Sequence, residues 1–155
     1  RNPCLESEME TVEIRKILIP LDFSTVSLGA LAHAEELAHR TAAEMILLYV
    51  IEPVVATMEF NTAGIIEANQ LERVNTRLTD LCAAEVRHGV NAVTQVEEGE
   101  AAATIIRVAA ERECDMVVMG THGHSGFRHL LLGSKAERVV RGAGCPVLTV
   151  GPIND

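Results

Sequence analysis

Residues 119–134 read M-G-T-H-G-H-S-G-F-R-H-L-L-L-G-S, and this stretch says the most about the fold. Its spaced glycines and the serine after them are Gly120, Gly123, Gly133 and Ser134. The apolar residues 116–119 lead into the stretch, and a helical pattern over 135–141 follows it. Glycine lets a backbone approach an anion, and a helix N-terminus offers free N–H groups and a positive dipole end. The order strand, glycine-rich loop, helix therefore predicts a phosphate-binding loop.

Composition narrows the class of protein. The chain has 155 residues, 48% hydrophobic and 23% charged, which is typical of one globular domain. We expect a loose tail over 1–12 and one nucleotide-binding domain over 13–155. The 13 basic and 22 acidic residues give a net charge of −9, which argues against nucleic acid as a partner. No apolar run reaches the roughly 20 residues that span a membrane.

The location expected from the sequence is the cytoplasm, since no signal-peptide pattern opens the chain. The cysteines also favour a reducing compartment, because none form a C-x-x-C pair and free thiols are the simpler interpretation. They are Cys4, Cys82, Cys114 and Cys145.

Hydrophobic patterning alternates between strands and helices. Short apolar runs predict strands at 14–21, 44–50, 93–97, 116–119 and 146–150. The predicted helices are one capped by Ser24 or Ser27, one over 64–88 ended by Gly89, one over 102–110, and one over 134–141. Ser134 and Glu137 suggest a capping box for the last of these. The alternation predicts a single Rossmann-like α/β domain with a five-stranded parallel sheet and helices on both faces.

The strand order decides where a ligand binds, because open α/β sheets bind ligands where the order reverses. The order 3-2-1-4-5 opens a crevice between the first and fourth strands, at residues 20–22 and 120–123. The order 2-1-3-4-5 would open the crevice between the first and third strands, at residues 97–99, which offer fewer groups that could bind a ligand. We therefore favour 3-2-1-4-5.

Several motifs together resemble the universal stress protein family. The spacing G-x2-G-x9-G-[ST] at Gly120, Gly123, Gly133 and Ser134 is similar to that family's nucleotide loop. The family's strands resemble K-I-L-I-P-L-D at 16–22, L-L-Y-V at 47–50 and G-C-P-V-L-T-V at 144–150. The resemblance covers about residues 14–150, nearly the whole domain.

The resemblance implies an ATP site. Asp22 would bind the ribose, Pro20 and Leu21 would line the adenosine, and Val50 would offer backbone groups to the adenine. The phosphates would be wrapped by Gly120, Gly123, Gly133 and Ser134 and by the backbone amides of Lys135 and Ala136. Met119 is a further residue that we expect to contact the cofactor. A divalent ion, Mg or Mn, would be carried by the phosphates rather than by a dedicated protein site. The family also implies a homodimer through the last strand.

The loop histidines invite two other interpretations. His122, His124 and His129 look like a metal cluster, but no cysteine or carboxylate lies near them before Glu137. The H-G-H run also resembles the histidine motif of nucleotidyl transferases, which follows the first strand rather than the fourth. We therefore expect His122 and His124 to shape the loop or contact phosphate. A Walker A motif is absent, because G-S-K at 133–135 has the wrong order.

Two features stay open at this point. Lys135 departs from the resemblance, since the family usually has a small or apolar residue there; its side chain either adds charge to the phosphate site or points to solvent. The apolar residues of 51–60 form a lid, a partner surface or a contact with the following helix.

The favoured function is an ATP-binding regulatory protein of the stress response, with little or no hydrolysis and with room for regulatory protein partners. The alternative is a slow ATPase or kinase-like enzyme that uses the same site, and a third hypothesis is a dimer without nucleotide. No catalytic residue is predicted.

Overall fold

The computed structural model describes residues 13–53, 63–122 and 132–152, and it describes no side chain over 63–68. The predicted tail over 1–12 lies outside these ranges, as do Gly123, His124 and His129.

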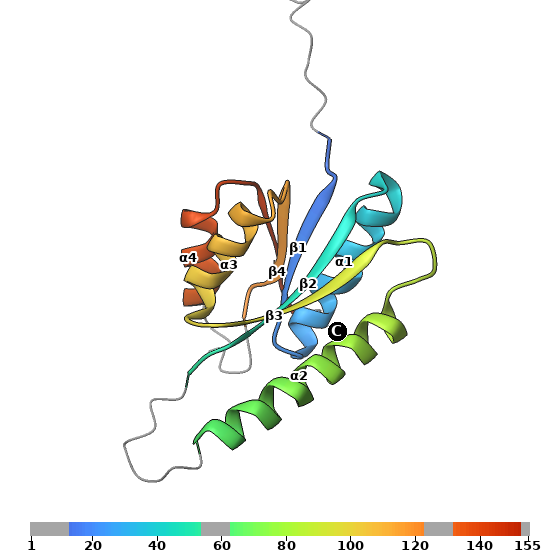
Figure 1. Ribbon diagram of the computed structural model, residues 1–155. Helices are drawn as coiled ribbons and strands as arrows, with labels where there is room; N and C mark the ends of the chain where they lie inside the picture. Colours follow the sequence, from blue (N-terminus) through green and yellow to red (C-terminus); the bar gives the residue numbers. More distant parts are fainter. Residues whose placement is uncertain (1–12, 54–62, 123–131, 153–155) are drawn as a thin grey trace, which may run out of the picture.

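Within the described ranges, five strands and four helices alternate along the chain (Figure 1). The strands are β1 (Lys16–Leu21), β2 (Glu44–Ile51), β3 (Ala92–Glu98), β4 (Met116–Gly120) and β5 (Val147–Val150). The helices are α1 (Thr25–Thr41), α2 (Ala63–Glu85), α3 (Ala101–Glu111) and α4 (Ser134–Gly142). The sheet is parallel with the order β3-β2-β1-β4-β5, so the predicted fold class and strand order are confirmed.

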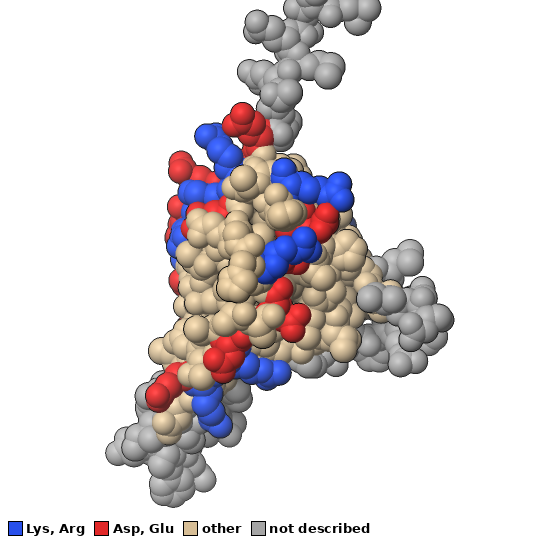
Figure 2. Space-filling view, turned by 90° about the vertical axis from the view of Figure 1, so that its right-hand side faces the viewer, with Lys and Arg blue, Asp and Glu red and all other residues tan. Residues whose placement is uncertain are grey.

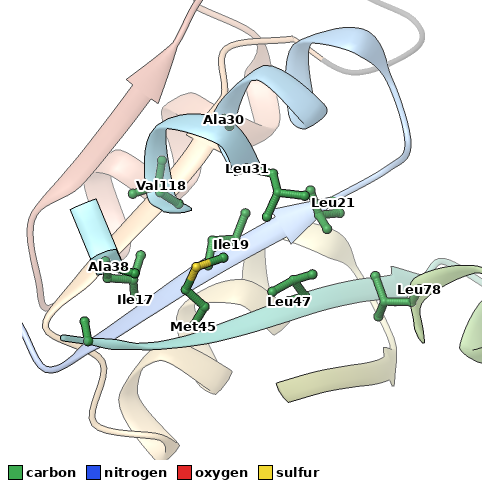
Figure 3. Packing of buried hydrophobic residues seen from close by; sticks show 12 residues of the cluster. Ile17, Ile19, Leu21, Ala30, Leu31, Ala38, Met45, Leu47, Leu78 and Val118 are labelled. Atoms are coloured by element: carbon green, nitrogen blue, oxygen red, sulfur yellow. The ribbon is translucent and has the colours of Figure 1, made fainter. Parts of the chain in front are cut away.

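Two hydrophobic clusters lie on opposite faces of the sheet. One packs α1 and α2 against residues such as Ile17, Ile19 and Leu47, and the other packs α3 and α4 against Leu18, Ile46 and Val117. Successive strand residues point to opposite faces, so the continuous apolar runs of β1 and β2 supply both clusters. Figure 3 shows the first cluster, with Leu31 of α1 beside Leu21 and with Leu78 of α2 at one end.

Helix α1 begins at one of the two predicted serines. Ser24 has extended backbone, and its hydroxyl accepts a hydrogen bond of 3.2 Å from the amide of Ser27. Ser27 lies inside the helix, where its own hydroxyl donates to the Ser24 carbonyl. Ser24 is therefore the N-cap.

The predicted capping box of α4 is wrong. Gly133, and not Ser134, is the N-cap, and no side chain caps the helix. The Gly133 amide donates 2.8 Å to the Thr121 carbonyl, so a tertiary contact fixes the extended residue one position before Ser134. Glu137 instead pairs with Arg141 along the helix.

The predicted end of α2 at Gly89 is also wrong. The helix ends at Glu85, and Gly89, with φ of +96°, lies in a turn closed by a bond from the Val90 amide to the Arg87 carbonyl. Glu35 of α1 accepts both the backbone amide and the guanidinium of Arg87, at 3.2 and 2.6 Å. The hydrogen bonds to Glu35 hold Arg87 outside the helix, so the helix ends before it reaches Gly89.

The face shown in Figure 2 carries acidic and basic side chains that are mixed with each other and set among uncharged residues. Arg87 pairs with Glu35 and Glu36, and Arg40 pairs with Glu36. That face is unlike the continuous basic surface that binds a nucleic-acid backbone. Over the described ranges, no helix is both long and apolar enough to cross a membrane.

Leu78 is the fully buried anchor of α2, and we expect Leu78→Ala to lower the free energy of unfolding by about 2–5 kcal/mol, because it leaves a cavity. Leu71 lies on the same helix but is 38% exposed, so Leu71→Ala is the matched control and should cost far less. Chemical denaturation of both variants measures the difference. Equal costs would show that Leu78 does not anchor the helix.

Candidate functional site

Strands β1 and β4 part at their carboxyl halves. Strand β1 pairs with β2 along its whole length, from Lys16 to Leu21, but its register with β4 covers only Ile17 and Leu18. The order of the sheet reverses between these two strands, since β2 and β3 lie on one side of β1 and β4 and β5 on the other. The structure thus separates the strands at the position where such sheets bind ligands.

Pro20 explains where the ladder stops. Backbone groups of β1 alternate in direction: the Arg15 carbonyl accepts from Glu44 at the start of β2, and the Lys16 carbonyl accepts from Asp115 next to β4. The same alternation points Leu18 and residue 20 toward β4. Proline has no amide hydrogen, so the next ladder bond has no donor.

The turn after β1 holds Asp22 in place. One carboxylate oxygen of Asp22 accepts a hydrogen bond of 2.9 Å from the Ser24 amide. Phe23, between them, has φ of +62°, a conformation rare for a bulky residue. Its ring stacks on Tyr49 with centroids 5.0 Å apart, and the Arg77 guanidinium lies 4.0 Å over its centroid. Contacts with β2 and α2 therefore support a strained turn beside the Asp22 carboxylate.

Gly120 ends β4 against helix α1. A Cβ built there would lie 2.9 Å from the Val26 side chain and 3.3 Å from the Ser27 amide nitrogen. The missing side chain lets the first turn of α1 approach the end of β4, which brings the Asp22 turn and residue 120 to the same edge of the sheet. Gly120 thus has a packing role that its place in the motif does not reveal.

The base of the glycine-rich loop is closed by backbone contacts. The Gly133 amide donates to the Thr121 carbonyl, and a Cβ on Gly133 would lie 2.8 Å from that same oxygen. The Thr121 amide in turn donates 2.8 Å to Val150 of β5. The two ends of segment 122–132 are thus held together at the carboxyl end of β4, and α4 starts directly after them.

His122 is the loop histidine that the structure describes. Its Nδ1 lies 2.9 Å from the Thr121 hydroxyl, and its ring lies beside Gly133. Its Nε2 is buried and has no hydrogen-bond partner within the described ranges. A buried ring nitrogen at the loop base is suited to a polar ligand atom.

The Lys135 side chain, for which the sequence left two alternatives open, is 56% exposed. Its ammonium pairs with the Glu52 carboxylate, just beyond the end of β2. The other Glu52 oxygen accepts 3.2 Å from the Ala101 amide of α3. These hydrogen bonds, first that from Lys135 and then that from Ala101, hold the Glu52 pKa below its usual value despite some burial.

Three predicted ligand contacts have side chains in the core. Leu21 belongs to the first cluster, and Met119 and Ala136 belong to the second. Only their backbone groups are therefore suited to bind a ligand. Val50 lies near the end of β2, in register with Glu97 of β3, and so at the same edge of the sheet.

The described residues contain no group of three or more His, Cys, Asp and Glu side chains arranged to hold a metal ion. The described cysteines, Cys82, Cys114 and Cys145, are free thiols. Burial raises the pKa of Cys114 to about 11, and burial also raises the pKa values of Cys82 and Cys145. These three cysteines are therefore structural rather than nucleophilic.

Comparison with known proteins then decides the family. The model of the universal stress protein family matches residues 13–151. The chain belongs to the universal stress protein family.

Its relatives extend over the same domain. Universal stress protein MJ0531 of Methanocaldococcus jannaschii is 37% identical over 138 residues, which are 88% of this chain and 81% of that protein. The solved structure of MJ0577 from the same organism is 26% identical, covers 92% of this chain and 99% of its own, and has a TM-score of 0.77. A universal stress protein solved in complex with cAMP has the same fold at 22% identity, with a TM-score of 0.61 and coverage of 89% and 97%.

Sequence reasoning missed Phe23, Thr121 and Glu52. A phenylalanine gives no sign that its backbone will be left-handed, and Thr121 gains its role from contacts with β5 and Gly133. Glu52 did carry a signal, because an acidic residue two positions after Val50 falls at the carboxyl edge of the sheet.

We expect Gly133→Ala to lower the free energy of unfolding by about 1–3 kcal/mol, because its Cβ would press on the Thr121 carbonyl. Gly144→Ala is the matched control, since a Cβ there meets nothing within 4 Å and its effect should stay within about 0.5 kcal/mol. Urea denaturation compares the two. A harmless Gly133→Ala would contradict the closed loop base.

Proposed function

We propose that this universal stress protein binds ATP at the carboxyl ends of β1 and β4, and that it acts as a regulatory protein with little or no hydrolysis. The observation that carries the proposal is the early end of the β1–β4 ladder, with Asp22 on one side and the closed loop base before α4 on the other. The universal stress protein solved with cAMP lends support, since the same fold there accepts an adenine nucleotide.

Each group has a role that fits its position. Asp22 is held at the end of β1, where its carboxylate would accept from the ribose hydroxyls. The backbone of Val50 would meet the adenine. The amides of Ser134, Lys135 and Ala136 open α4 without a side-chain cap, so they would bind phosphate oxygens.

A divalent ion would come with the nucleotide. The described residues offer no metal cluster, whereas a triphosphate supplies its own oxygen ligands. Bound Mg or Mn would neutralise phosphate charge. Gly123 and His124 remain part of the proposed phosphate side on the strength of the motif alone.

Asp22→Asn tests the ribose contact. The amide keeps an oxygen that can accept from Ser24, so the turn is preserved while the charge is lost. A charge-assisted hydrogen bond contributes roughly 1.5–3 kcal/mol, so calorimetry should show about tenfold or greater weakening for adenosine and ATP alike.

Asp115→Asn is the control for that experiment. The Asp115 carboxylate accepts from the amides of Arg15 and Lys16, at 2.8 and 2.9 Å, at the opposite edge of the sheet. This variant should bind both ligands as the wild type does. Weakening of ATP alone in Asp22→Asn would place Asp22 at the phosphates, and a wild type that binds no nucleotide would disprove the proposed function.

We also propose a homodimer in which β5 pairs with its copy. Strand β5 is an edge of the sheet, and Leu148 is 39% exposed. The Pro146 carbonyl accepts a hydrogen bond from Val117 of β4, and the Val150 carbonyl accepts one from Thr121 directly after β4. Alternation therefore points Leu148 toward β4 and Thr149 outward. Antiparallel pairing around a two-fold axis would use the outward groups and cover both edges.

Thr149→Pro therefore removes an outward donor without touching the β4 ladder, and sedimentation velocity should show a monomer. Thr149→Val keeps the amide and the branched shape, and it should stay dimeric. If the folded Thr149→Pro variant is still a dimer, the interface does not lie at β5.

A further inference from the structure

Four charged residues join α3 to α4 at the carboxyl edge of the sheet. Glu52 pairs with Lys135, and Glu100 pairs with Arg138 at 2.8 Å. Lys135 and Arg138 are three positions apart on α4, so they lie on one face of that helix. We name these four residues the ionic clasp.

The two carboxylates are anchored on the first amides of α3. Glu52 accepts from Ala101, and Glu100 is the N-cap residue that accepts from Ala102 and Ala103, at 3.2 and 2.9 Å. Both glutamates are thus fixed in place by backbone donors. Their hydrogen bonds lower both pKa values, led by Lys135 for Glu52 and by Ala103 for Glu100, so both are charged at neutral pH.

The cations are less constrained. Lys135 and Glu52 are 56% and 43% exposed, and an ion pair in such surroundings contributes little to stability. Lys135 can therefore exchange Glu52 for another anion at a small cost in free energy. Lys135 directly follows Ser134 in the first turn of α4, whereas Arg138 is nearly one turn further along.

We propose that Glu52 competes with the phosphate chain of a bound nucleotide for the ammonium of Lys135, so that this pair determines how strongly the site prefers ATP to adenosine. The inference rests on the proposed function. The Lys135 ammonium at the start of α4 already pairs with Glu52. A phosphate chain that binds there must therefore displace Glu52 from Lys135. Adenosine has no phosphate and should be indifferent to the exchange.

The test is a double-mutant cycle read by calorimetry, with ATP and adenosine as separate probes. Glu52→Gln keeps an oxygen for the Ala101 amide but gives up the charge that holds Lys135. It should raise ATP affinity by up to about fivefold, the range of an exposed ion pair, and leave adenosine unchanged. Lys135→Gln should weaken ATP, and in that background Glu52→Gln should have no further effect.

Glu100→Gln is the matched control, because it breaks the other pair of the clasp and leaves Lys135 with Glu52. It should not change the ratio of ATP to adenosine affinity. A change in that ratio as large as with Glu52→Gln would overturn the inference.

Three other outcomes would also overturn it. An unchanged ratio in Glu52→Gln shows no competition. If Glu52→Gln raises ATP affinity equally in the Lys135→Gln background, Glu52 acts by repelling the phosphate chain and not by competing for Lys135. An equal gain for adenosine shows a contact with the nucleoside. In each case ATP still binds and the proposed function stands, whereas a wild type that binds neither probe removes both proposals.

Discussion

Strand β1 loses one of its two hydrogen-bonding neighbours halfway along, because Pro20 has no amide hydrogen to donate toward β4. The central strand of a parallel sheet would otherwise pair on both sides to its end. The strands separate where the strand order reverses. The missing amide hydrogen of Pro20 and the topology of the sheet thus act at the same place. The candidate site follows from this, since Asp22 ends one strand and Gly120 ends the other.

Close backbone approaches then complete the edge. Gly120 admits the first turn of α1, and Gly133 admits the Thr121 carbonyl, and a side chain at either position would lie under 3 Å from its neighbour. Both glycines of the motif that the structure describes therefore serve packing as well as any ligand. The strain in this region is carried by Phe23, whose ring is held by Tyr49 and Arg77. Stability and the proposed ligand binding would thus depend on the same few contacts.

Charge at this edge is arranged in pairs rather than as a basic patch. Lys135 and Arg138 face glutamates anchored on α3, so α4 brings cations to the edge whose charges are already balanced. Such an arrangement avoids a general attraction for anions, which suits a protein with a net charge of −9. A phosphate would then be recognised by the uncharged backbone amides of α4 and by Lys135 once it leaves Glu52.

The sequence by itself determined the fold class and the strand order, and it indicated the edge that carries the candidate site. Apolar periodicity is local and marks each element, and the positions of Asp22 and the glycines select one order because they must share an edge. The element boundaries were predicted less well. Gly133 replaced Ser134 as the cap because its amide bonds to Thr121, and Glu35 ended α2 before Gly89.

Only the tertiary structure decided which side chains are available to a ligand. Leu21, Met119 and Ala136 are predicted ligand contacts, yet their side chains fill the two cores. Lys135 reads as a phosphate or solvent residue until the fold brings Glu52 to it from 83 positions earlier in the chain. Contacts between residues so distant in sequence depend on how helices pack on the sheet, and periodicity carries no record of that packing.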